Sequence, residues 1–202
     1  MPAGTGPACT AGGWHITVAV RVLRSGGIVL HATEGVWGLA CDPFNARAVT
    51  RLLAIKRRPV NKGLILIGST ADCFEPELLL VDPASRTRIE ATWPGAVTWI
   101  LPQQRFPAWI TGEHETVAVR VPGHPQARAL AAGFGGPLVS TSANAGGQKP
   151  AGNRWQALRF ASRSEPAVDY MLPGEVLGLR GPSAIRTPEG ATLRESAGAV
   201  RH

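Results

Sequence analysis

Short apolar segments alternate with segments of helical periodicity along most of this chain. A helix is predicted over residues 14–24, since small residues at 25–27 end it. Its apolar positions Val18, Val22 and Leu23 share one face. The same patterns predict further helices over residues 45–56, 71–80, 83–92, 125–132 and 154–160. They predict strands at residues 28–30, 64–67, 97–101, 116–121, 137–139, 168–172, 183–187 and 191–194. Such alternation favours an α/β fold with a mixed or largely parallel sheet covered by helices.

Two segments depart from this alternation. Residues 33–42 contain two glycines and little periodicity, and we expect a functional loop there. Residues 1–12 are rich in Gly, Pro, Ala and Thr, which is typical of a flexible leader. No internal repeat or heptad pattern divides the rest. The sequence therefore predicts one folded domain over residues 13–202.

The composition is that of a globular chain. Hydrophobic residues make up 44% of the 202 residues, which is enough to bury a core and excludes wholesale disorder. The sequence has neither a signal-peptide pattern nor an apolar run of about 18 residues, so we expect a cytoplasmic protein that does not enter the membrane. Its three cysteines are widely spaced, which argues against a disulfide framework or a structural zinc site.

The charge balance brings in an anionic partner as a candidate. The net charge is +7, although only 17% of the residues are charged. Nucleic acid and phosphorylated small molecules both fit this surplus. A compositional bias toward arginine explains it equally well, so the total charge does not decide between them.

The densest group of cations lies between a helix end and a buried strand. Four of them surround Pro59, which fixes a bend: Lys56, Arg57, Arg58 and Lys62. Arginine offers a planar fork for phosphate oxygens and lysine a mobile point charge, so the segment can hold a polyphosphate. Cations at a helix C-terminus also offset the helix dipole, which is the alternative interpretation.

A polar turn is predicted at residues 140–144, directly after an apolar strand. Ligands of open α/β sheets bind outside the carboxyl ends of strands, where hydroxyls and an amide can hydrogen-bond a phosphate or a base. Gly146 and Gly147 would expose backbone N–H groups beside them. The alternative is an ordinary turn that caps the following segment.

Thr33 and Glu34 lie beside Gly35 in the expected loop. A hydroxyl and a carboxylate there can orient a small substrate that carries an amine and a hydroxyl; alternatively, the segment is a connector around a buried Trp37. The sequence has no P-loop, no G-x-G-x-x-G after a strand and no G-x-S-x-G elbow. Its five histidines lack metal-ligand spacing, so no metal site is predicted.

These motifs follow one another in a specific order. They are Thr33-Glu34-x-x-x-Gly38-Leu39, Cys41-Asp42-Pro43, Lys56-x-Arg58-Pro59, Lys62-Gly63-Leu64-Ile65, Trp93-Pro94-Gly95, Val119-Arg120-Val121-Pro122, Ser140-Thr141-Ser142-Ala143-Asn144, and Ser183 with Arg194. In this order and spacing, from about residue 14 to residue 195, the chain resembles the YrdC/TsaC family, the L-threonylcarbamoyladenylate synthases. The resemblance implies a single-domain, YrdC-like twisted mixed sheet flanked by helices, with a concave basic face.

The resemblance also implies a reaction and its partners. ATP, L-threonine and bicarbonate would become threonylcarbamoyl-AMP and pyrophosphate, which is nucleotidyltransferase chemistry. The product would supply the threonylcarbamoyl group for N6 of adenosine 37 in tRNAs that read ANN codons. Mg²⁺ would accompany ATP as the cofactor. Partners would be proteins of the tRNA threonylcarbamoylation complex, together with tRNA or double-stranded RNA.

Site residues follow from the same motifs. The reaction needs in-line positioning and neutralisation of the leaving pyrophosphate more than it needs an acid or a base. Lys56 and Arg58 would be the catalytic residues, whereas Arg57 would be a surface charge. ATP would contact Lys56, Arg58, Lys62, Thr116, Ser142, Asn144 and Arg194. Threonine would contact Thr33, Arg120, Ser140 and Ser183, with Arg120 as the partner of its carboxylate.

The chain departs from the family pattern at several positions. The family usually has Tyr-Pro or a similar pair where this chain has His31-Ala32, and Gly35 stands where Thr or Ala is common. Both changes would alter loop stiffness and threonine affinity. Ile67 stands where longer relatives have a histidine, and the chain ends soon after Arg194. We therefore expect the short form, without an extra C-terminal domain.

Two other function classes remain open. A non-catalytic ribosome-maturation module that binds double-stranded RNA or tRNA would use the basic face alone. ATP–pyrophosphate exchange that requires both threonine and bicarbonate separates it from the enzyme. The carbamoyl-transferring domain of hydrogenase maturation proteins is the other class, but it is normally embedded in a longer chain with zinc-finger-like cysteines.

Overall fold

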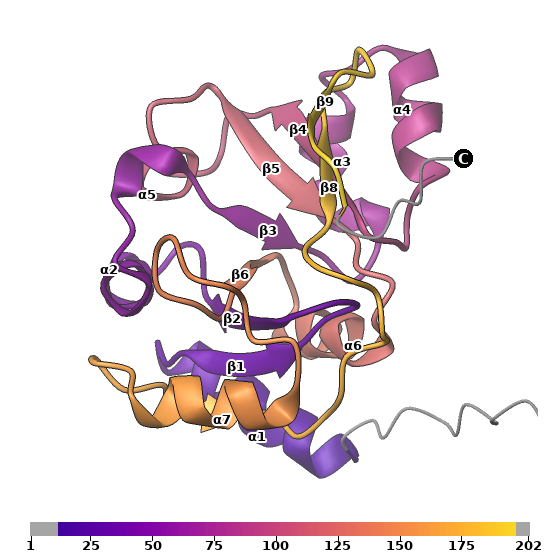
Figure 1. The fold of residues 1–202 in the computed structure, drawn as a ribbon. Helices are drawn as coiled ribbons and strands as arrows, with labels where there is room; N and C mark the ends of the chain where they lie inside the picture. The colour runs from indigo at the N-terminus through magenta and orange to yellow at the C-terminus, as the bar shows by residue number, and fades with distance from the viewer. Residues whose placement is uncertain (1–11, 197–202) are drawn as a thin grey trace, which may run out of the picture.

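The structure, a computed structural model, describes residues 12–196 as one sheet flanked by helices (Figure 1). Apart from Gly12, the predicted leader lies outside the described residues. The helices are α1 (Gly13–Arg24), α2 (Ala46–Lys56), α3 (Glu75–Leu78), α4 (Pro83–Glu90), α5 (Ala108–Thr111), α6 (Pro125–Phe134) and α7 (Arg154–Ser162), with the 3-10 helices η1 (Val60–Lys62) and η2 (Ala71–Phe74). The strands are β1 (Val29–Ala32), β2 (Trp37–Cys41), β3 (Ile65–Ile67), β4 (Val97–Pro102), β5 (Thr116–Arg120), β6 (Leu138–Ser142), β7 (Tyr170–Met171), β8 (Ala184–Arg186) and β9 (Thr192–Arg194).

The sheet is mixed, and its strands run in the order β7-β1-β2-β6-β3-β5-β4-β8-β9. Parallel pairs join β1 to β7, β3 to β5 and β4 to β8. The remaining neighbours pair antiparallel. This arrangement confirms the predicted α/β class, and it brings the first strand of the chain beside the seventh.

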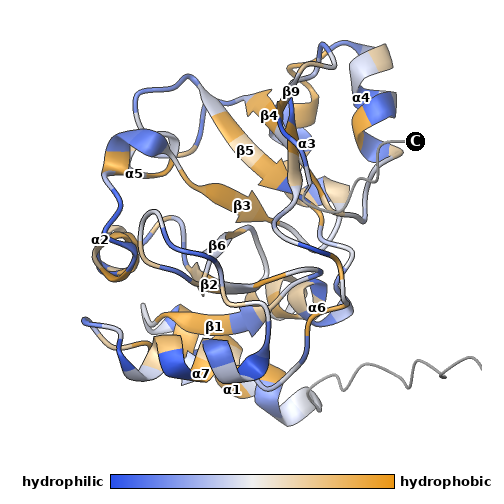
Figure 2. Ribbon diagram, in the orientation of Figure 1, coloured by the Kyte–Doolittle hydropathy of each residue, from blue (hydrophilic) through white to orange (hydrophobic). Residues whose placement is uncertain are grey.

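Two apolar clusters form the core, one on each side of the sheet. On one side, α1 and α6 pack against β3 and β6, where Leu23 and Leu130 lie with Ile67 and Leu138. On the other side, α2 packs against β2 and α3 against β4, and buried side chains of α2, α3 and α4 share one cluster with those of β4 and β5. Figure 2 shows that strands β1, β3 and β5 are largely hydrophobic. The buried apolar surface on both faces supplies the main driving force for this fold.

Half of the segment expected to be a functional loop, residues 33–42, is strand. After a short turn the chain forms β2, in which Leu39 pairs with Leu30 of β1 in an antiparallel hairpin. Every residue of β2 is buried, so the strand lacks the apolar–polar alternation by which a strand is predicted. Gly38 further weakens the signal, and its lack of a side chain suits a place where an added Cβ would lie 3.2 Å from the Thr141 carbonyl oxygen.

Strand β6 is also longer than expected. It continues through Ser142, so the hydroxyl residues 140–142 belong to a strand rather than to a polar turn. Hydroxyl and amide residues favour turns in general, and here pairing with β2 overrides that preference. The true turn begins at Ala143.

Helix boundaries agree closely with the prediction. The Asn45 side chain accepts the Ala48 N–H at 3.1 Å, which caps α2 as expected. Arg57 follows α2 in the left-handed conformation with φ 49°, and the chain then turns at Pro59. The end of α2 thus brings Lys56 and Arg58 to the sheet.

None of the described helices is long and apolar enough to cross a membrane.

Candidate active site

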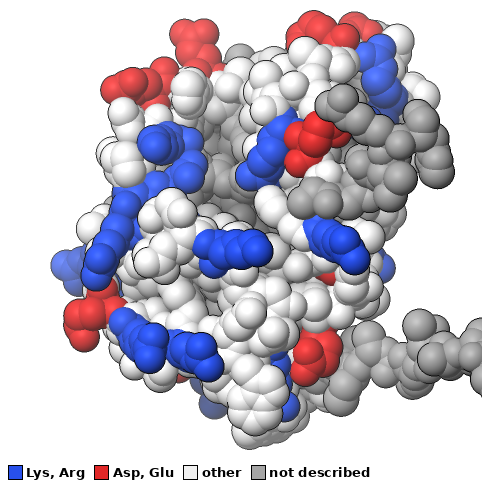
Figure 3. Space-filling model, viewed as in Figure 1, with Lys and Arg blue, Asp and Glu red and all other residues white. Residues whose placement is uncertain are grey.

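A cleft of about 390 Å³ opens on one face of the sheet. Figure 3 shows the molecule hollowed on this side, with Lys and Arg side chains around the hollow. All residues that the sequence predicts to contact ATP or threonine line this cleft: Thr33, Lys56, Arg58, Lys62, Thr116, Arg120, Ser140, Ser142, Asn144, Ser183 and Arg194. Segments far apart in the sequence therefore meet at one place.

Strand alternation explains how the sheet lines the cleft. Thr116, Ala118 and Arg120 occupy alternate positions of β5 and point to one face. Ile65 of β3 and Ile100 of β4 both pair with Ala118, so they share that face. Helices α1 and α6 cover the adjoining part of this sheet face. The cleft lies over the part of the face that these two helices leave uncovered.

Lys56 connects the end of α2 to the end of β6. Its Nζ donates to the carbonyl oxygen of Ser142, to that of Asn144 at 3.1 Å and to Asn144 Oδ1 at 3.2 Å. These acceptors match the three donors of an ammonium group. Burial, with a smaller contribution from Arg58, lowers the pKa of Lys56 from 10.5 to about 8.

Arg58 shapes the basic segment that follows. Its Nη2 donates to the carbonyl oxygens of Lys62 at 3.1 Å and of Gly63 at 2.9 Å, which folds η1 back toward the helix end. Its Nε is buried without a hydrogen-bond partner among the described residues. Burial also lowers the pKa of Arg58. Lys62 and Arg57 are exposed at the rim, and Arg57 agrees with the prediction of a surface charge.

The polar residues after β6 form a closed local network. Ser142 Oγ donates to Asn144 Oδ1 at 2.7 Å, and Asn144 Nδ2 donates to the Gln148 carbonyl oxygen at 2.7 Å. The Gly146 N–H donates to the Lys56 carbonyl oxygen at 2.8 Å. The expectation that Gly146 exposes its N–H to a ligand is therefore wrong, because α2 already accepts that donor.

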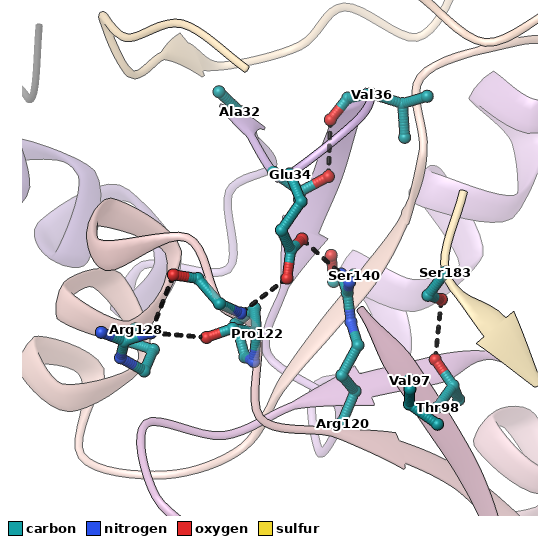
Figure 4. Close-up of polar contacts among 12 residues, drawn as sticks. Ala32, Glu34, Val36, Val97, Thr98, Arg120, Pro122, Arg128, Ser140 and Ser183 are labelled. Atoms are coloured by element: carbon teal, nitrogen blue, oxygen red, sulfur yellow. Dashed lines mark hydrogen bonds and ion pairs between the residues drawn. The ribbon is translucent and has the colours of Figure 1, made fainter. Parts of the chain in front are cut away.

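The opposite end of the cleft is built around a buried ion pair. Arg120 Nη1 lies 2.9 Å from Glu34 Oε2, and the two side chains are only 8% and 5% exposed. The other carboxylate oxygen, Glu34 Oε1, accepts the Gly123 N–H at 2.6 Å (Figure 4). Glu34 does not line the main cleft but an adjoining cavity, which it shares with Thr33, Arg120 and Ser183. Thr33 does line the main cleft, and its Oγ1 donates to the Val36 carbonyl oxygen at 2.6 Å.

Ser183 is held from two sides. Its Oγ lies 2.8 Å from Thr98 Oγ1, and its carbonyl oxygen accepts from Arg194 Nε at 3.0 Å and Nη2 at 2.8 Å. Thr98 is fully buried in β4, and sequence analysis did not single it out. The available signal is a hydroxyl on the same face as Ile100, within an otherwise apolar strand.

His31, one of the departures from the family pattern, contacts the cleft through Ser140. It is completely buried in β1, and its Nε2 lies 3.3 Å from Ser140 Oγ while Nδ1 lies 3.2 Å from the Ala32 carbonyl oxygen. Burial, with smaller contributions from His124 and Arg120, lowers the pKa of His31 to about 3. The neutral ring therefore donates from Nδ1 to the Ala32 carbonyl oxygen and accepts a hydrogen bond from the Ser140 hydroxyl at Nε2.

The charges in the cleft are all of one sign. No Asp or Glu is among the described residues that line it, and its basic residues are Lys56, Arg57, Arg58, Lys62, Arg120 and Arg194. Burial lowers the pKa of Arg194, and the charges of Arg120 and Arg58 lower it further. The described residues contain no group of three or more His, Cys, Asp or Glu that could hold a metal ion. The arrangement suits a polyanion bound by protein cations.

Known proteins resemble this chain over most of its length. A family model for the Sua5/YciO/YrdC domain, described as telomere recombination, matches residues 21–196. Proteins named threonylcarbamoyl-AMP synthase are similar: one from Stutzerimonas stutzeri is 46% identical over 178 residues, which are 87% of this chain and 93% of that protein. One from Halorhodospira halophila is 43% identical and covers 96% of this chain and 97% of that protein.

Solved structures share the fold. Sua5 from P. abyssi, in a complex with L-threonine, superposes with a TM-score of 0.79 at 26% identity and covers 86% of this chain but only 51% of its own. YciO from E. coli superposes with a TM-score of 0.77 at 26% identity, over 92% of this chain and 91% of that one. With the family model matching most of its length, this chain belongs to the Sua5/YciO/YrdC family.

Proposed function

We propose that this protein is an L-threonylcarbamoyladenylate synthase, which forms threonylcarbamoyl-AMP and pyrophosphate from L-threonine, bicarbonate and ATP. The observation that carries the proposal is one cleft in which a lysine–arginine cluster at the end of α2 faces a buried arginine at the end of β5. The first suits a triphosphate and the second an amino-acid carboxylate. Relatives that share over 40% identity with this chain carry the name threonylcarbamoyl-AMP synthase.

The nucleotide would occupy the side of the cleft formed by α2, η1 and the end of β6. Arg58 and Lys62 neutralise the β- and γ-phosphates, and Arg194 approaches from β9. Lys56 contributes its charge near the α-phosphate while its N–H donors hold Ser142 and Asn144 in place. Thr116 and the Ser142 hydroxyl oxygen would hydrogen-bond the nucleoside, and Asn144 would do so by exchanging a bond of its local network.

L-Threonine would occupy the other side. Arg120 pairs with its carboxylate, because a guanidinium fork matches carboxylate geometry. Ser140, Ser183 and Thr33 offer hydroxyl oxygens that can accept from its amine or hydrogen-bond its hydroxyl. Their partners, His31, Thr98 and the Val36 carbonyl oxygen, fix the direction of each hydroxyl.

The chemistry would proceed by nucleophilic displacement at phosphorus. The threonine amine adds to the carbon of bicarbonate, water leaves, and an N-carboxylate forms. One of its oxygens attacks the ATP α-phosphorus, the bond from that phosphorus to the bridging oxygen breaks, and the electron pair leaves with pyrophosphate. Cations around the leaving group stabilise its developing charge, and the two-ended cleft holds the reactants in line.

We also propose that Mg²⁺ enters with ATP. The cleft-lining residues that the structure describes include no carboxylate, which is the protein ligand that Mg²⁺ most often uses, so they do not build a metal site of their own. Phosphate oxygens and water would hold the ion. The protein's contribution to charge neutralisation comes from Lys56, Arg58 and Lys62.

The test is to identify the product by mass spectrometry after incubation with ATP, threonine and bicarbonate. Threonylcarbamoyl-AMP should form, and omission of bicarbonate or threonine should abolish it. We expect Lys56→Ala and Arg58→Ala to lose most of the rate, by about a hundredfold or more, because each removes a cation from the transition state. The matched control is Arg47→Ala, which removes an exposed arginine of the same helix outside the cleft.

The proposal fails if folded protein forms no such product, or if Lys56→Ala and Arg58→Ala both turn over normally. The alternative of a non-catalytic RNA-binding module predicts the first of these outcomes. If the product forms, the nucleotidyltransferase class follows. The threonylcarbamoyl group of this product would be transferred to tRNA by the partner proteins of the threonylcarbamoylation complex. A reconstituted tRNA-modification assay measures that transfer.

A further inference from the structure

We propose that Glu34 is a positioning residue, which presets Arg120 and the segment that carries Ser183 before threonine binds. The inference rests on the proposed function, because it concerns the threonine end of the same cleft. Glu34 is 4% exposed and does not line the main cleft, so it acts through its neighbours rather than on the bulk of the substrate.

The Glu34 carboxylate is held on both oxygens. Oε2 pairs with Arg120 Nη1 at 2.9 Å, and Oε1 accepts the Gly123 N–H at 2.6 Å. Gly123 is fixed in turn, because Arg128 of α6 donates to the carbonyl oxygens of Pro122 at 2.8 Å and Gly123 at 2.9 Å (Figure 4). A continuous chain of contacts thus runs from helix α6 to the guanidinium of Arg120.

This arrangement fixes the Arg120 side chain without using all of its donors. Its Nε is buried and has no hydrogen-bond partner among the described residues. Arg120 lines both the main cleft and an adjoining cavity of about 140 Å³, which Thr33, Glu34 and Ser183 also line. A buried arginine without a counter-charge is costly, so Glu34 keeps Arg120 inside the site when threonine is not bound. The Arg120 side chain then loses less conformational freedom when threonine binds.

The backbone of Glu34 and Gly35 contacts the segment that leads to Ser183. The Glu34 carbonyl oxygen accepts the Leu179 N–H at 3.1 Å. Gly35 packs so closely on this segment that an added Cβ would lie 2.7 Å from the Leu179 carbonyl oxygen and nearer still to that of Gly181. Residues 179–182 lead directly into Ser183. One dipeptide therefore sets two groups proposed to contact threonine, Arg120 through the Glu34 side chain and Ser183 through the backbone.

The expected signature is selective for threonine. Glu34→Gln keeps the size of the side chain, but its amide cannot accept from both Arg120 and Gly123 in the present geometry. We expect the threonine KM to rise by about tenfold or more, and the ATP KM to stay within about twofold. A residue that only stabilised the fold would lower the melting temperature without a selective effect on the threonine KM.

The experiment measures pyrophosphate release at varied threonine and at varied ATP. It compares wild type with Glu34→Gln, Arg120→Gln and the double variant. Because Glu34 acts through Arg120, the double variant should have a threonine KM no higher than that of Arg120→Gln. The matched control is Glu77→Gln. Glu77 is 1% exposed and paired with Arg105 at 2.8 Å outside the cleft, so its loss should lower the melting temperature but leave the threonine KM unchanged.

The outcomes separate this inference from the proposed function. An unchanged threonine KM in Glu34→Gln, or effects of Glu34→Gln and Arg120→Gln that multiply in the double variant, overturns the role of Glu34 alone. An unchanged threonine KM in Arg120→Gln overturns the carboxylate role of Arg120, and the inference with it. Should Glu34→Gln not fold, Glu34→Asp withdraws the carboxylate but keeps its charge: a raised threonine KM with an unchanged ATP KM supports the inference, and an unchanged threonine KM overturns it.

Discussion

The ammonium group of Lys56 is buried between α2 and β6, and each of its donors meets an oxygen acceptor of Ser142 or Asn144. The same burial disfavours its charged form, since desolvation is the largest cause of its lowered pKa. Lys56 is therefore cationic at neutral pH but much closer to losing its proton than an ordinary lysine. A phosphate group placed beside it would restore the favourable environment for its charge.

A pH profile follows from this. With a pKa of about 8 in the free protein, Lys56 carries its charge below that pH and loses it above. We expect kcat/KM for ATP to fall by about tenfold for each pH unit above about 8, because kcat/KM reports the groups of the free enzyme. Lys56→Met should lack this limb at its lower activity. A wild-type profile that stays flat to about pH 9.5 would contradict the assignment.

The lowered pKa of Lys56 also makes the folding stability depend on pH, and this stability rises over the pH range in which the rate falls. The unfolded chain binds the Lys56 proton more tightly than the folded protein, since the pKa rises from about 8 to 10.5 on unfolding. The contribution of Lys56 to the free energy of unfolding therefore increases as the pH rises through this window. Chemical denaturation of wild type and Lys56→Met between these pH values isolates that contribution.

Secondary-structure elements differ in how much of them could be predicted. Helix α2 carries local signals at both ends, Asn45 as its cap and Pro59 beyond its end, and both predictions are confirmed. Strand β2 carries none, because it is buried throughout and contains Gly38. Its assignment depends on pairing with β1 and β6, which are set by tertiary structure.

The turn between β1 and β2 offers a test at this scale. Gly35 has an ordinary negative-φ backbone, and its constraint is the close approach of residues 179–182. We expect Gly35→Ala to push that segment away, lower the melting temperature and raise the threonine KM. Gly136→Ala is the matched control, because an added Cβ there meets nothing within 4 Å. Equal melting temperatures and threonine KM values in the two variants would contradict the packing argument.

Across the whole molecule, the cleft gathers cations from α2, β5 and β9 with no carboxylate among its described lining residues. Burial is the main cause of the lowered pKa of Arg194, and the charges of Arg120 and Arg58 lower it further, which indicates mutual repulsion in the free protein. Binding of a polyanion relieves that repulsion and favours the folded state by mass action.

Inorganic tripolyphosphate should therefore raise the melting temperature. The rise should be larger than that in sodium chloride at the same ionic strength, because the effect is local neutralisation rather than general screening. In Arg58→Ala it should shrink, whereas in Arg47→Ala it should persist. Differential scanning calorimetry measures all three. A rise that is the same in the chloride control would mean that the cleft does not hold the polyanion.

How far the site could be predicted depends on the kind of contact. Residues such as Arg58, Ser142 and Arg120 could be named from motif order, and the structure brings them into one cleft. The inward turn of Glu34 and the hydroxyl pair of Thr98 with Ser183 could not, because each depends on a partner distant in the sequence. Motifs identify residue types, whereas the folded chain decides which of them face the ligand.

The strand order has a consequence for the protein during its synthesis. Strand β1 lies near the beginning of the chain, and one of its two edges pairs with β7, which is made much later. At the other end of the sheet, β8 and β9 are the last strands to be added. Ser183 and Arg194 arrive on those last segments, beside residues made as early as Thr33. A nascent chain on the ribosome thus exposes an unfinished sheet edge until about residue 170 emerges, and it has no complete cleft until the final strand docks. Nucleotide affinity should therefore appear late in translation, after the sheet has closed at both ends.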